Sequence, residues 1–280
     1  MMIPFWKMHG AGNDFILIDD RQNKFSADNI ELIKRICCRR TGIGSEGLIL
    51  IRSSTIADFR MRFFNPNGNE AEMCGNGARC VAQLAHDLRI TGTTMKFETR
   101  AGIISAEVNH KSVKLQLPPA TSYLKDQTLI TQSGEEINYD FINTGVPHVV
   151  VQTKDLENYP VTKNGYAIIK HQDFAPNETN VNFAQLCSKD SINIRTFERG
   201  VEDETLACGT GITATAISMA LRNLVHPPVS VTAASGDRLI VDFCIQNSTV
   251  SKITLTGPAT HVFSGEIELN APLNNENNHA

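Results

Sequence analysis

Short apolar runs alternate along this chain with longer amphipathic ones. Residues 13–18 and 48–51 carry compact aliphatic or aromatic runs, and residues 59–64 alternate in polarity, so we predict strands in all three segments. A helix is predicted from Ser26, which can act as its N-cap, to about Arg40, because apolar side chains recur there at helical spacing.

Two further helices are predicted, and each begins at a cysteine. One runs from Cys74 to about Leu88, and the other from Cys208 to about Leu224, before the two prolines at 227–228. The second helix is apolar or small nearly all round. A helix of that kind is predicted to be surrounded by protein rather than laid on a surface.

The remaining apolar runs predict strands on both sides of one internal boundary. These strands are expected within 95–117, around Phe141, and at 149–151, 192–197, 239–244 and 253–255. Pro118-Pro119 is the best boundary, because two prolines suit neither a helix nor a central strand. The order of elements before it recurs after it, and the asparagine-rich residues 271–280 are predicted to form a disordered tail.

The two helix-initiating cysteines belong to one motif that occurs twice. Met-Cys-Gly-Asn-Gly at 73–77 is matched by Ala-Cys-Gly-Thr-Gly at 207–211, with Cys74 and Cys208 close to half the chain apart. A second pair of segments, 8–13 and 143–148, repeats at nearly the same offset. We interpret this as an internal duplication that brings two thiols to one site from two similar lobes.

Composition excludes several classes of protein. The 280 residues are 41% hydrophobic and 20% charged, with a net charge of −4, as expected of a soluble globular protein. We expect no nucleic-acid partner, because there is no run of lysine and arginine. We expect no secretion or membrane insertion, because the apolar runs are short.

The number and spacing of the cysteines indicate the redox compartment of the protein. Seven cysteines, an odd number without a signal peptide, argue against a disulfide framework and for a reducing, cytoplasmic compartment. There is no Cys-x-x-Cys, so no metal site is expected. An isolated cysteine near an apolar helix is usually a small core residue. That explanation suits the other five cysteines but leaves the repeated glycines unexplained.

The duplicated motif has a specific chemistry. At the first turn of a helix, the macrodipole and the unpaired N–H groups favour a thiolate over a thiol. The following glycines let amides hold an anion, such as a substrate carboxylate. A thiolate on one face of the α-carbon can then remove a proton while a thiol on the other face returns one. No pyridoxal-binding context or metal cluster is evident, so no cofactor is expected.

One glycine-rich segment matches the sequence fingerprint of a dinucleotide-binding site. Residues 42–47 match G-x-G-x-x-G, but the fingerprint requires a strand before it and a helix after it. Here a helix precedes and a strand follows. We therefore predict a helix-to-strand loop that borders the site.

Three long motifs carry a resemblance to a known family. Residues 8–15, 65–80 and 198–211 resemble diaminopimelate epimerase, and the match extends to about Leu269. The resemblance implies a cofactor-independent isomerase that interconverts LL- and meso-2,6-diaminopimelate on the route to lysine and peptidoglycan. It also implies an α/β (α+β) homodimer whose subunit has two similar pseudo-symmetric lobes. Each lobe is a mixed sheet wrapped around a central helix, with the site in the cleft between the lobes.

The expected lobes follow the boundary at the prolines. Residues 1–118, joined by about 260–270 returning, form the N-terminal lobe with Cys74. Residues 119–259 form the C-terminal lobe with Cys208.

The resemblance assigns roles to individual residues. Cys74 and Cys208 match the catalytic pair, and His148 and Glu198 match residues that tune them. The implied substrate contacts are Asn13, Asn65, Gly75, Asn76, Asn180, Glu198, Arg199, Gly209 and Thr210. A guanidinium suits the distal carboxylate of diaminopimelate, because it can pair with both oxygens.

Three positions depart from the family pattern. Many members have glutamine where this chain has Gly47 and asparagine where it has Val146, so two polar contacts at the distal end are in doubt. Asn67, where aspartate is common, is interpreted as a local turn difference.

Two alternatives stay open at this point. A proline or hydroxyproline racemase would use the same paired thiols without a second carboxylate-binding set. A thiol redox or metal-binding module would contain bound metal or a cycling thiol pair.

Overall fold

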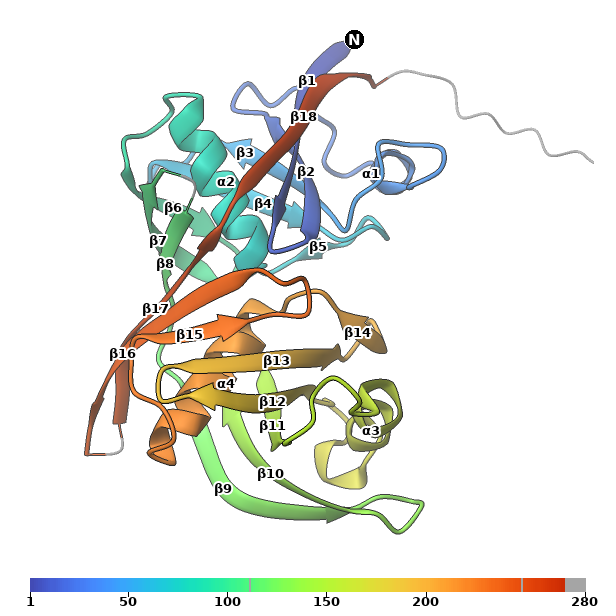
Figure 1. Cartoon of the computed structure of the whole chain (residues 1–280). Coiled ribbons are helices and arrows are strands. Elements are labelled where there is room, and N and C mark those ends of the chain that lie inside the picture. Colours follow the sequence, from blue (N-terminus) through green and yellow to red (C-terminus); the bar gives the residue numbers. More distant parts are fainter. Residues whose placement is uncertain (111, 248, 270–280) are drawn as a thin grey trace, which may run out of the picture.

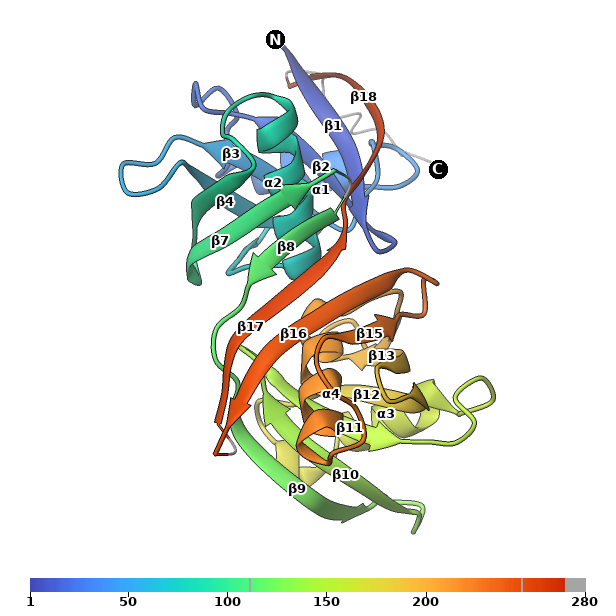
Figure 2. The same ribbon diagram turned by 60° about the vertical axis from the view of Figure 1, so that its left-hand side comes forward.

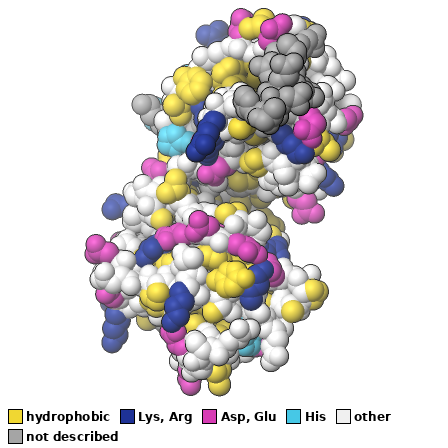
Figure 3. Space-filling view, turned by 90° about the vertical axis from the view of Figure 1, so that its right-hand side faces the viewer, with side chains coloured by type: hydrophobic (Ala, Val, Ile, Leu, Met, Phe, Trp, Pro, Cys, Tyr) yellow, Lys and Arg dark blue, Asp and Glu magenta, His cyan; other side chains and the backbone are white. Residues whose placement is uncertain are grey.

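The molecule consists of two lobes joined by long strands (Figure 1). The computed structural model describes residues 1–110, 112–247 and 249–269, so the predicted tail at 271–280 lies outside the described residues. In the space-filling view the molecule narrows between the lobes, and side chains of both charge signs are scattered over this face (Figure 3).

The lobe that begins the chain contains two helices and nine strands among the described residues. The helices are α1 (Ile30–Cys37) and α2 (Gly75–Asp87). The strands are β1 (Met2–Gly10), β2 (Asn13–Asp19), β3 (Leu48–Arg52), β4 (Phe59–Phe64), β5 (Glu70–Ala71), β6 (Thr94–Thr99), β7 (Gly102–Asn109), β8 (Ser112–Gln116) and β18 (Thr260–Glu268).

Among the described residues, the second lobe also contains two α-helices and nine strands, and in addition one short 3₁₀ helix, η1 (Gln172–Phe174). Its helices are α3 (Val161–Ile169) and α4 (Gly209–Leu221). Its strands are β9 (Thr121–Ile130), β10 (Glu136–Asn143), β11 (Pro147–Gln152), β12 (Asn180–Ser188), β13 (Ser191–Glu198), β14 (Asp203–Thr205), β15 (Val229–Thr232), β16 (Arg238–Gln246) and β17 (Thr249–Pro258).

Strand pairing makes the internal duplication visible. The first lobe runs β18-β1-β2-β3-β4-β6-β7-β8, with β5 also paired to β4. The second runs β9-β10-β11-β12-β13-β15-β16-β17, with β14 also paired to β13. Parallel pairs fall at equivalent places, β2–β3 and β4–β6 against β11–β12 and β13–β15. The expected mixed α/β fold of two pseudo-symmetric lobes is confirmed.

The two repeats exchange their last strands. β9 follows β8 along the chain but pairs with β10 of the second lobe, and β18 follows β17 but pairs with β1 of the first. Between the lobes β8 and β17 pair antiparallel, so all eighteen described strands belong to one hydrogen-bonded sheet (Figure 2). Neither lobe therefore completes its sheet without the other half of the chain.

A helix lies at the centre of each lobe. α2 contacts β1, β2, β7 and β8, and α4 contacts β10, β11, β12 and β16. Almost every residue of α4 is buried, which confirms that this helix is surrounded by protein. The core is continuous between the lobes, because residues around α2 and α4 belong to one apolar cluster.

The first predicted helix is shorter than its sequence pattern indicates. α1 begins after Asn29, whose Oδ1 accepts a hydrogen bond from the Leu32 N–H at 3.0 Å, rather than after Ser26. The segment before it is held in a loop, because Asp20 Oδ1 accepts the N–H of Phe25 at 2.9 Å. Helix α3 was missed, since its interior contains Asn164 and Gly165, which are weak helix formers.

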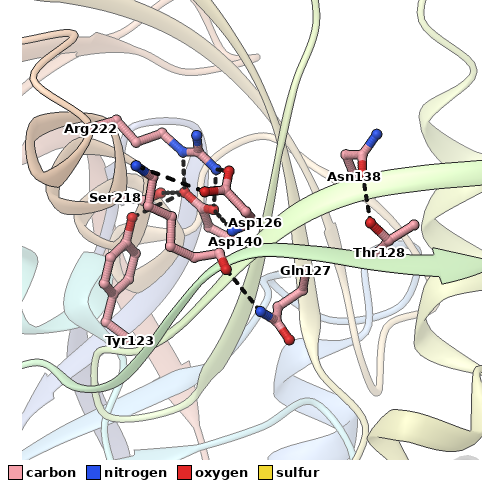
Figure 4. A network of polar contacts seen from close by, with 9 residues as sticks. Tyr123, Asp126, Gln127, Thr128, Asn138, Asp140, Ser218 and Arg222 are labelled. Carbon is pink, nitrogen blue, oxygen red and sulfur yellow. Dashed lines mark hydrogen bonds and ion pairs between the residues drawn. The ribbon is translucent and has the colours of Figure 1, made fainter.

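A buried carboxylate joins the end of α4 to the hairpin of β9 and β10 (Figure 4). Asp140 is 2% exposed and accepts hydrogen bonds from Arg222 Nε at 2.6 Å and Ser218 Oγ at 2.6 Å. The Asp126 N–H and the Tyr123 hydroxyl donate to it at 3.0 and 3.2 Å. Burial alone would raise the pKa of Asp140, but Arg222, Ser218 and the amide hold it below its usual range.

We predict that Asp140→Asn lowers the free energy of unfolding at pH 7 by about 2–4 kcal/mol, because Arg222 loses its buried partner. The native pKa lies below the unfolded value of about 3.9, so this stabilisation is present at neutral pH and is lost as the pH falls. Urea unfolding at pH 7 and at pH 3.5 measures the difference. Asp126→Asn, at an exposed carboxylate, is the control and should cost under about 1 kcal/mol. An equal decrease in the free energy of unfolding in the two variants would contradict the stabilising role given to Asp140.

Candidate active site

Cys74 and Cys208 occupy equivalent positions in the two lobes. Cys74 is the N-cap residue of α2 and Cys208 is the N-cap residue of α4, and both have extended backbones. Neither side chain makes a capping hydrogen bond to its helix. Amides of each first turn nevertheless act on the sulfur, those of Gly77 and Asn76 on Cys74 and that of Gly211 on Cys208, and all of them favour an anion there.

One side chain ties the two helix starts together. Asn76 Nδ2 donates to the Ala207 carbonyl at 2.9 Å, directly before Cys208. Its Oδ1 accepts from Arg79 at 3.0 Å. Both the Nδ2 and the Oδ1 of Asn76 are therefore held in hydrogen bonds. Within the second lobe, Thr144 Oγ1 donates to the Thr210 carbonyl at 3.0 Å and fixes the first turn of α4.

Arg79 is a buried cation beside the two helix starts, a position that the sequence pattern did not predict. Its side chain is fully buried and donates from Nε to the Pro258 carbonyl at 3.1 Å, in addition to Asn76. Among the described residues, no carboxylate lies within ion-pair distance of it. A buried cation without a carboxylate partner favours negative charge nearby. Its charge acts to lower the pKa of Cys74.

Burial nevertheless dominates the acidity of both thiols. It raises the pKa of Cys74, and the amides of Gly77 and Asn76 oppose it only in part. It also raises the pKa of Cys208, and the negative charge of Glu198 adds to that effect. The helix amides contribute as expected from the sequence, but the resting thiols are protonated because desolvation outweighs them.

Glu198 lies at the end of β13 and contacts Cys208. Its Oε1 accepts a hydrogen bond from Thr205 Oγ1 at 2.6 Å. The Cys208 sulfur lies 3.5 Å from Thr210 Oγ1, and the charge of the Glu198 carboxylate raises the pKa of this thiol. Burial raises the pKa of Glu198, although Thr205 and then Cys208 partly oppose this. A carboxylate with a raised pKa beside a thiol is suited to accept its proton.

A hydrogen-bond network fixes the tautomer of His148. Asn182 Nδ2 donates to the Val149 carbonyl at 2.9 Å, and Thr196 Oγ1 donates to Asn182 Oδ1 at 3.1 Å. The same Nδ2 lies 3.1 Å from His148 Nδ1, which must therefore accept. The proton of the neutral ring then sits on Nε2, which is buried and has no partner among the described residues. Burial, followed by the charge of Arg199, lowers the pKa of His148 to about 3.

The glycine at 211 makes this network possible. A Cβ at Gly211 would lie 2.2 Å from Asn182 Oδ1. The absence of a side chain on α4 thus lets the Asn182 amide reach both His148 and Val149. The second glycine of the cysteine motif therefore has a packing role that the repeat did not reveal.

The three remaining asparagines that were expected to contact substrate, Asn13, Asn65 and Asn180, differ in their hydrogen bonds. Asn180 Oδ1 accepts the N–H of Arg199 at 3.0 Å, which fixes the backbone from which the Arg199 guanidinium extends. Asn13 Oδ1 is buried without a partner among the described residues. Asn65 begins the turn after β4, where its carbonyl accepts the Gly68 N–H at 2.9 Å. No described hydrogen bond joins Asn13 or Asn65 to the cysteines.

The position of Gly47 has no room for a side chain. A Cβ there would lie 2.4 Å from Phe63 Cε2 and 2.8 Å from the Phe64 carbonyl oxygen. The segment 42–47 connects α1 to β3, which confirms the predicted helix-to-strand loop. Glutamine could not replace Gly47 unless Phe63 moved.

The described ranges contain neither a metal-binding cluster nor a membrane-spanning helix. Within them, no group of three or more histidine, cysteine or acidic side chains is arranged to hold a metal ion. No helix in the same ranges is both long and apolar enough to cross a membrane.

The two-lobed fold, in which this chain has a helix that begins at a cysteine in each lobe, is shared with solved structures. A phenazine biosynthesis protein of the PhzF family from Bacillus anthracis superposes with a TM-score of 0.74 at 18% identity, covering 96% of this chain and 99% of that one. A hydroxyproline epimerase from Agrobacterium vitis gives 0.69 at 17% identity, over 97% and 94% of the two chains. At these identities the likeness concerns the fold.

The particular family follows from sequence comparison. The profile described as "Diaminopimelate epimerase" matches residues 5–122 and 141–262, one segment for each repeat. The diaminopimelate epimerase of Aquifex aeolicus (strain VF5) is 45% identical over 277 residues, covering 95% of this chain and 98% of that protein. That of Chlorobaculum tepidum is 42% identical, covering 94% and 100%. The chain belongs to the diaminopimelate epimerase family, and the resemblance seen in its motifs is confirmed.

We predict that His148 stays neutral, with its proton on Nε2, from pH 8 down to pH 5. Nitrogen NMR of the labelled imidazole measures both the charge and the tautomer. Because the native pKa is far below the unfolded value of about 6.5, folding stability should fall as the pH drops below about 6.5. Asn182→Asp should shift the proton to Nδ1, since a carboxylate accepts where the amide donated. A His148 midpoint near 6.5, or an unchanged tautomer in the variant, would contradict this account.

Proposed function

We propose that this chain interconverts LL- and meso-2,6-diaminopimelate by transferring an α-proton between two cysteine thiols, without a cofactor. One observation carries the proposal. Cys74 and Cys208 begin helices of different lobes, and those helix starts are joined by the hydrogen bond from Asn76 to Ala207. Two acid–base groups from opposite sides are what inversion at a carbon requires.

The helix ends would hold the carboxylate of the reacting centre. The amides of Gly75 and Asn76 and those of Gly209 and Thr210 lie in the first turns of α2 and α4. Oriented N–H groups stabilise charge where it develops as the α-proton leaves. The buried Arg79 cation adds to this positive potential beside the first pair.

Proton balance requires one thiolate and one thiol. The Cα–H bond breaks, its electron pair delocalises into the carboxylate, and the proton passes to the thiolate. The opposite thiol then protonates the other face of the carbon. For Cys208 the acceptor that generates the thiolate is Glu198, whose charge acts on the thiol and whose own pKa is raised by burial. The unpaired Nε2–H of His148 is a donor available to an anion in the site.

Arg199 and its neighbours would bind the distal amino-acid centre of the substrate. The Arg199 backbone is fixed by Asn180, and one guanidinium nitrogen donates to the Asn177 carbonyl. The rest of the fork is available for a carboxylate. At Gly47 a polar side chain is sterically excluded by Phe63, so this chain relies on fewer groups at that end.

The proposal includes the cellular compartment, the pathway and the oligomeric state of the enzyme. The family resemblance implies cytoplasmic lysine and peptidoglycan biosynthesis and a homodimer. Light scattering of the purified protein tests the dimer. Deuterium incorporation at the α-carbon of diaminopimelate in heavy water tests the reaction.

We predict that Cys74→Ala and Cys208→Ala each abolish epimerisation, because neither thiol can serve both faces of the carbon. The conversion of LL- to meso-diaminopimelate is followed by chiral chromatography. Cys38→Ala and Cys187→Ala change exposed cysteines outside the site and should leave turnover nearly unchanged. Full activity in either single variant of the catalytic pair would rule out the two-base mechanism.

We predict that Arg199→Met lowers kcat/KM for diaminopimelate by about 30- to several thousand-fold, which corresponds to roughly 2–5 kcal/mol for a lost charged partner. Arg199→Lys should also be poor, because an ammonium cannot form the bidentate fork. The decisive quantity is the ratio of catalytic efficiencies for diaminopimelate and an amino acid without the distal carboxylate. An unchanged ratio in Arg199→Met would show that Arg199 does not read the distal end.

A further inference from the structure

A second candidate site lies on the first lobe, formed by residues that have no role in the cysteine site. It is an open pocket of about 310 Å³. Its lining is basic or neutral throughout and consists of Arg21, Asn23, Arg52, Ser53, Arg60 and Arg62. We call it the arginine pocket.

The strand register places three of these arginines on one face of the sheet. β3 and β4 are antiparallel neighbours (Figure 1), and Arg52 lies directly opposite Arg60. Arg62 is two residues from Arg60 on the same strand, so it points to the same side. Like charges directly opposite one another across a pair of strands are destabilising. The fold therefore concentrates positive charge where sheet stability alone would disfavour it.

The carboxylates around the pocket do not saturate these guanidinium groups. Three arginines are paired with acidic residues outside the lining: Arg21 with Asp19 at 2.8 Å, Arg52 with Asp20 at 2.6 Å and Arg62 with Glu70 at 2.9 Å. Each of these pairs uses Nε, Nη2 or both, and none involves Nη1.

Arg60 is the least satisfied of the four. Its nearest acidic partner is Glu98, whose Oε1 lies 3.9 Å from Nε, beyond hydrogen-bond distance. Among the described residues the Arg60 guanidinium makes no hydrogen bond, and its Nε is shielded from solvent. Burial, and then the positive charge of Arg62, lower the pKa of Arg52, although Asp20 opposes them. The guanidinium groups of Arg52 and Arg62 therefore repel each other, and a bound anion would relieve that repulsion.

We propose that the arginine pocket binds a phosphoryl group, either as inorganic phosphate or as the terminal phosphate of a small metabolite. A single carboxylate is planar and satisfies one guanidinium fork, whereas a phosphate dianion has oxygens directed to several donors at once. Three neighbouring arginines on one sheet face and a fourth, Arg21, from beyond β2 match such a multivalent anion. The small volume favours a phosphate or pyrophosphate group over a larger ligand.

The test is isothermal titration of the full chain with phosphate, at constant ionic strength maintained with chloride. Arg60→Gln is the test variant, because it removes a guanidinium that supports no described hydrogen bond. Arg238→Gln, at an exposed arginine of β16 in the other lobe, makes the same charge change and is the matched control. We expect saturable binding to the unaltered protein, a dissociation constant at least about tenfold weaker in Arg60→Gln, and a change of under about twofold in Arg238→Gln.

Two further ligands distinguish the sources of the phosphoryl group. Tighter binding of ADP than of phosphate, with no binding of adenosine, supports a metabolite phosphate. Equal binding of ADP and phosphate supports the free anion. Thermal unfolding supplies a second readout, since phosphate should raise the Tm of the unaltered protein and of Arg238→Gln but not of Arg60→Gln. No saturable binding of phosphate over chloride, equal affinity in Arg60→Gln, or binding of adenosine as tight as ADP would overturn the proposal.

Discussion

The hydrogen bond from Asn76 to the Ala207 carbonyl is the contact on which the site depends. It joins residues 131 positions apart and holds the N-termini of α2 and α4 beside each other. Two helix N-termini carry partial positive charges and repel, and the buried Arg79 adds a full charge. The sheet that runs through β8 and β17 also keeps the lobes together. The arrangement is consequently favourable to an anion between the helices, which is the requirement of a carboxylate substrate.

Duplication supplies a symmetric frame, and a few side chains break the symmetry. In each lobe a short strand pairs with the end of a longer one and leads directly to a cysteine, as β5 does beside β4 and β14 beside β13. Phe64 pairs with Glu70 and Phe197 pairs with Glu204, each four residues before its cysteine, and the next residue is Asn65 in the first lobe but Glu198 in the second. Equivalent backbones therefore carry a neutral amide in one lobe and a carboxylate in the other. This difference allows the two thiols to have different partners.

Burial sets the protonation states on which the proposed chemistry relies. It raises the pKa of both cysteines and of Glu198, and it lowers the pKa of His148. Every one of these groups is thereby shifted towards its neutral form in the resting site. Charge must then be created by proton transfer within the site, where the Glu198 carboxylate and the Cys208 thiol influence each other's pKa. The same dry surroundings strengthen the interaction of oriented amides with the charge that develops.

The sequence by itself determined the local features of this protein. Spacing and composition over short stretches predict four of its features. These are the duplicated cysteine motif, the helices that begin at Cys74 and Cys208, the burial of α4 and the loop at 42–47. These patterns reflect backbone geometry and solvent exclusion, which act between near neighbours.

Only the tertiary structure decided which distant groups meet. The exchange of β9 and β18, the position of Arg79 behind Asn76 and the Asn182 amide that sets the His148 tautomer depend on contacts between remote segments. The protonation of the thiols was also decided there. Desolvation depends on everything packed around an atom, whereas the helix-end effect expected from the sequence depends only on the first turn.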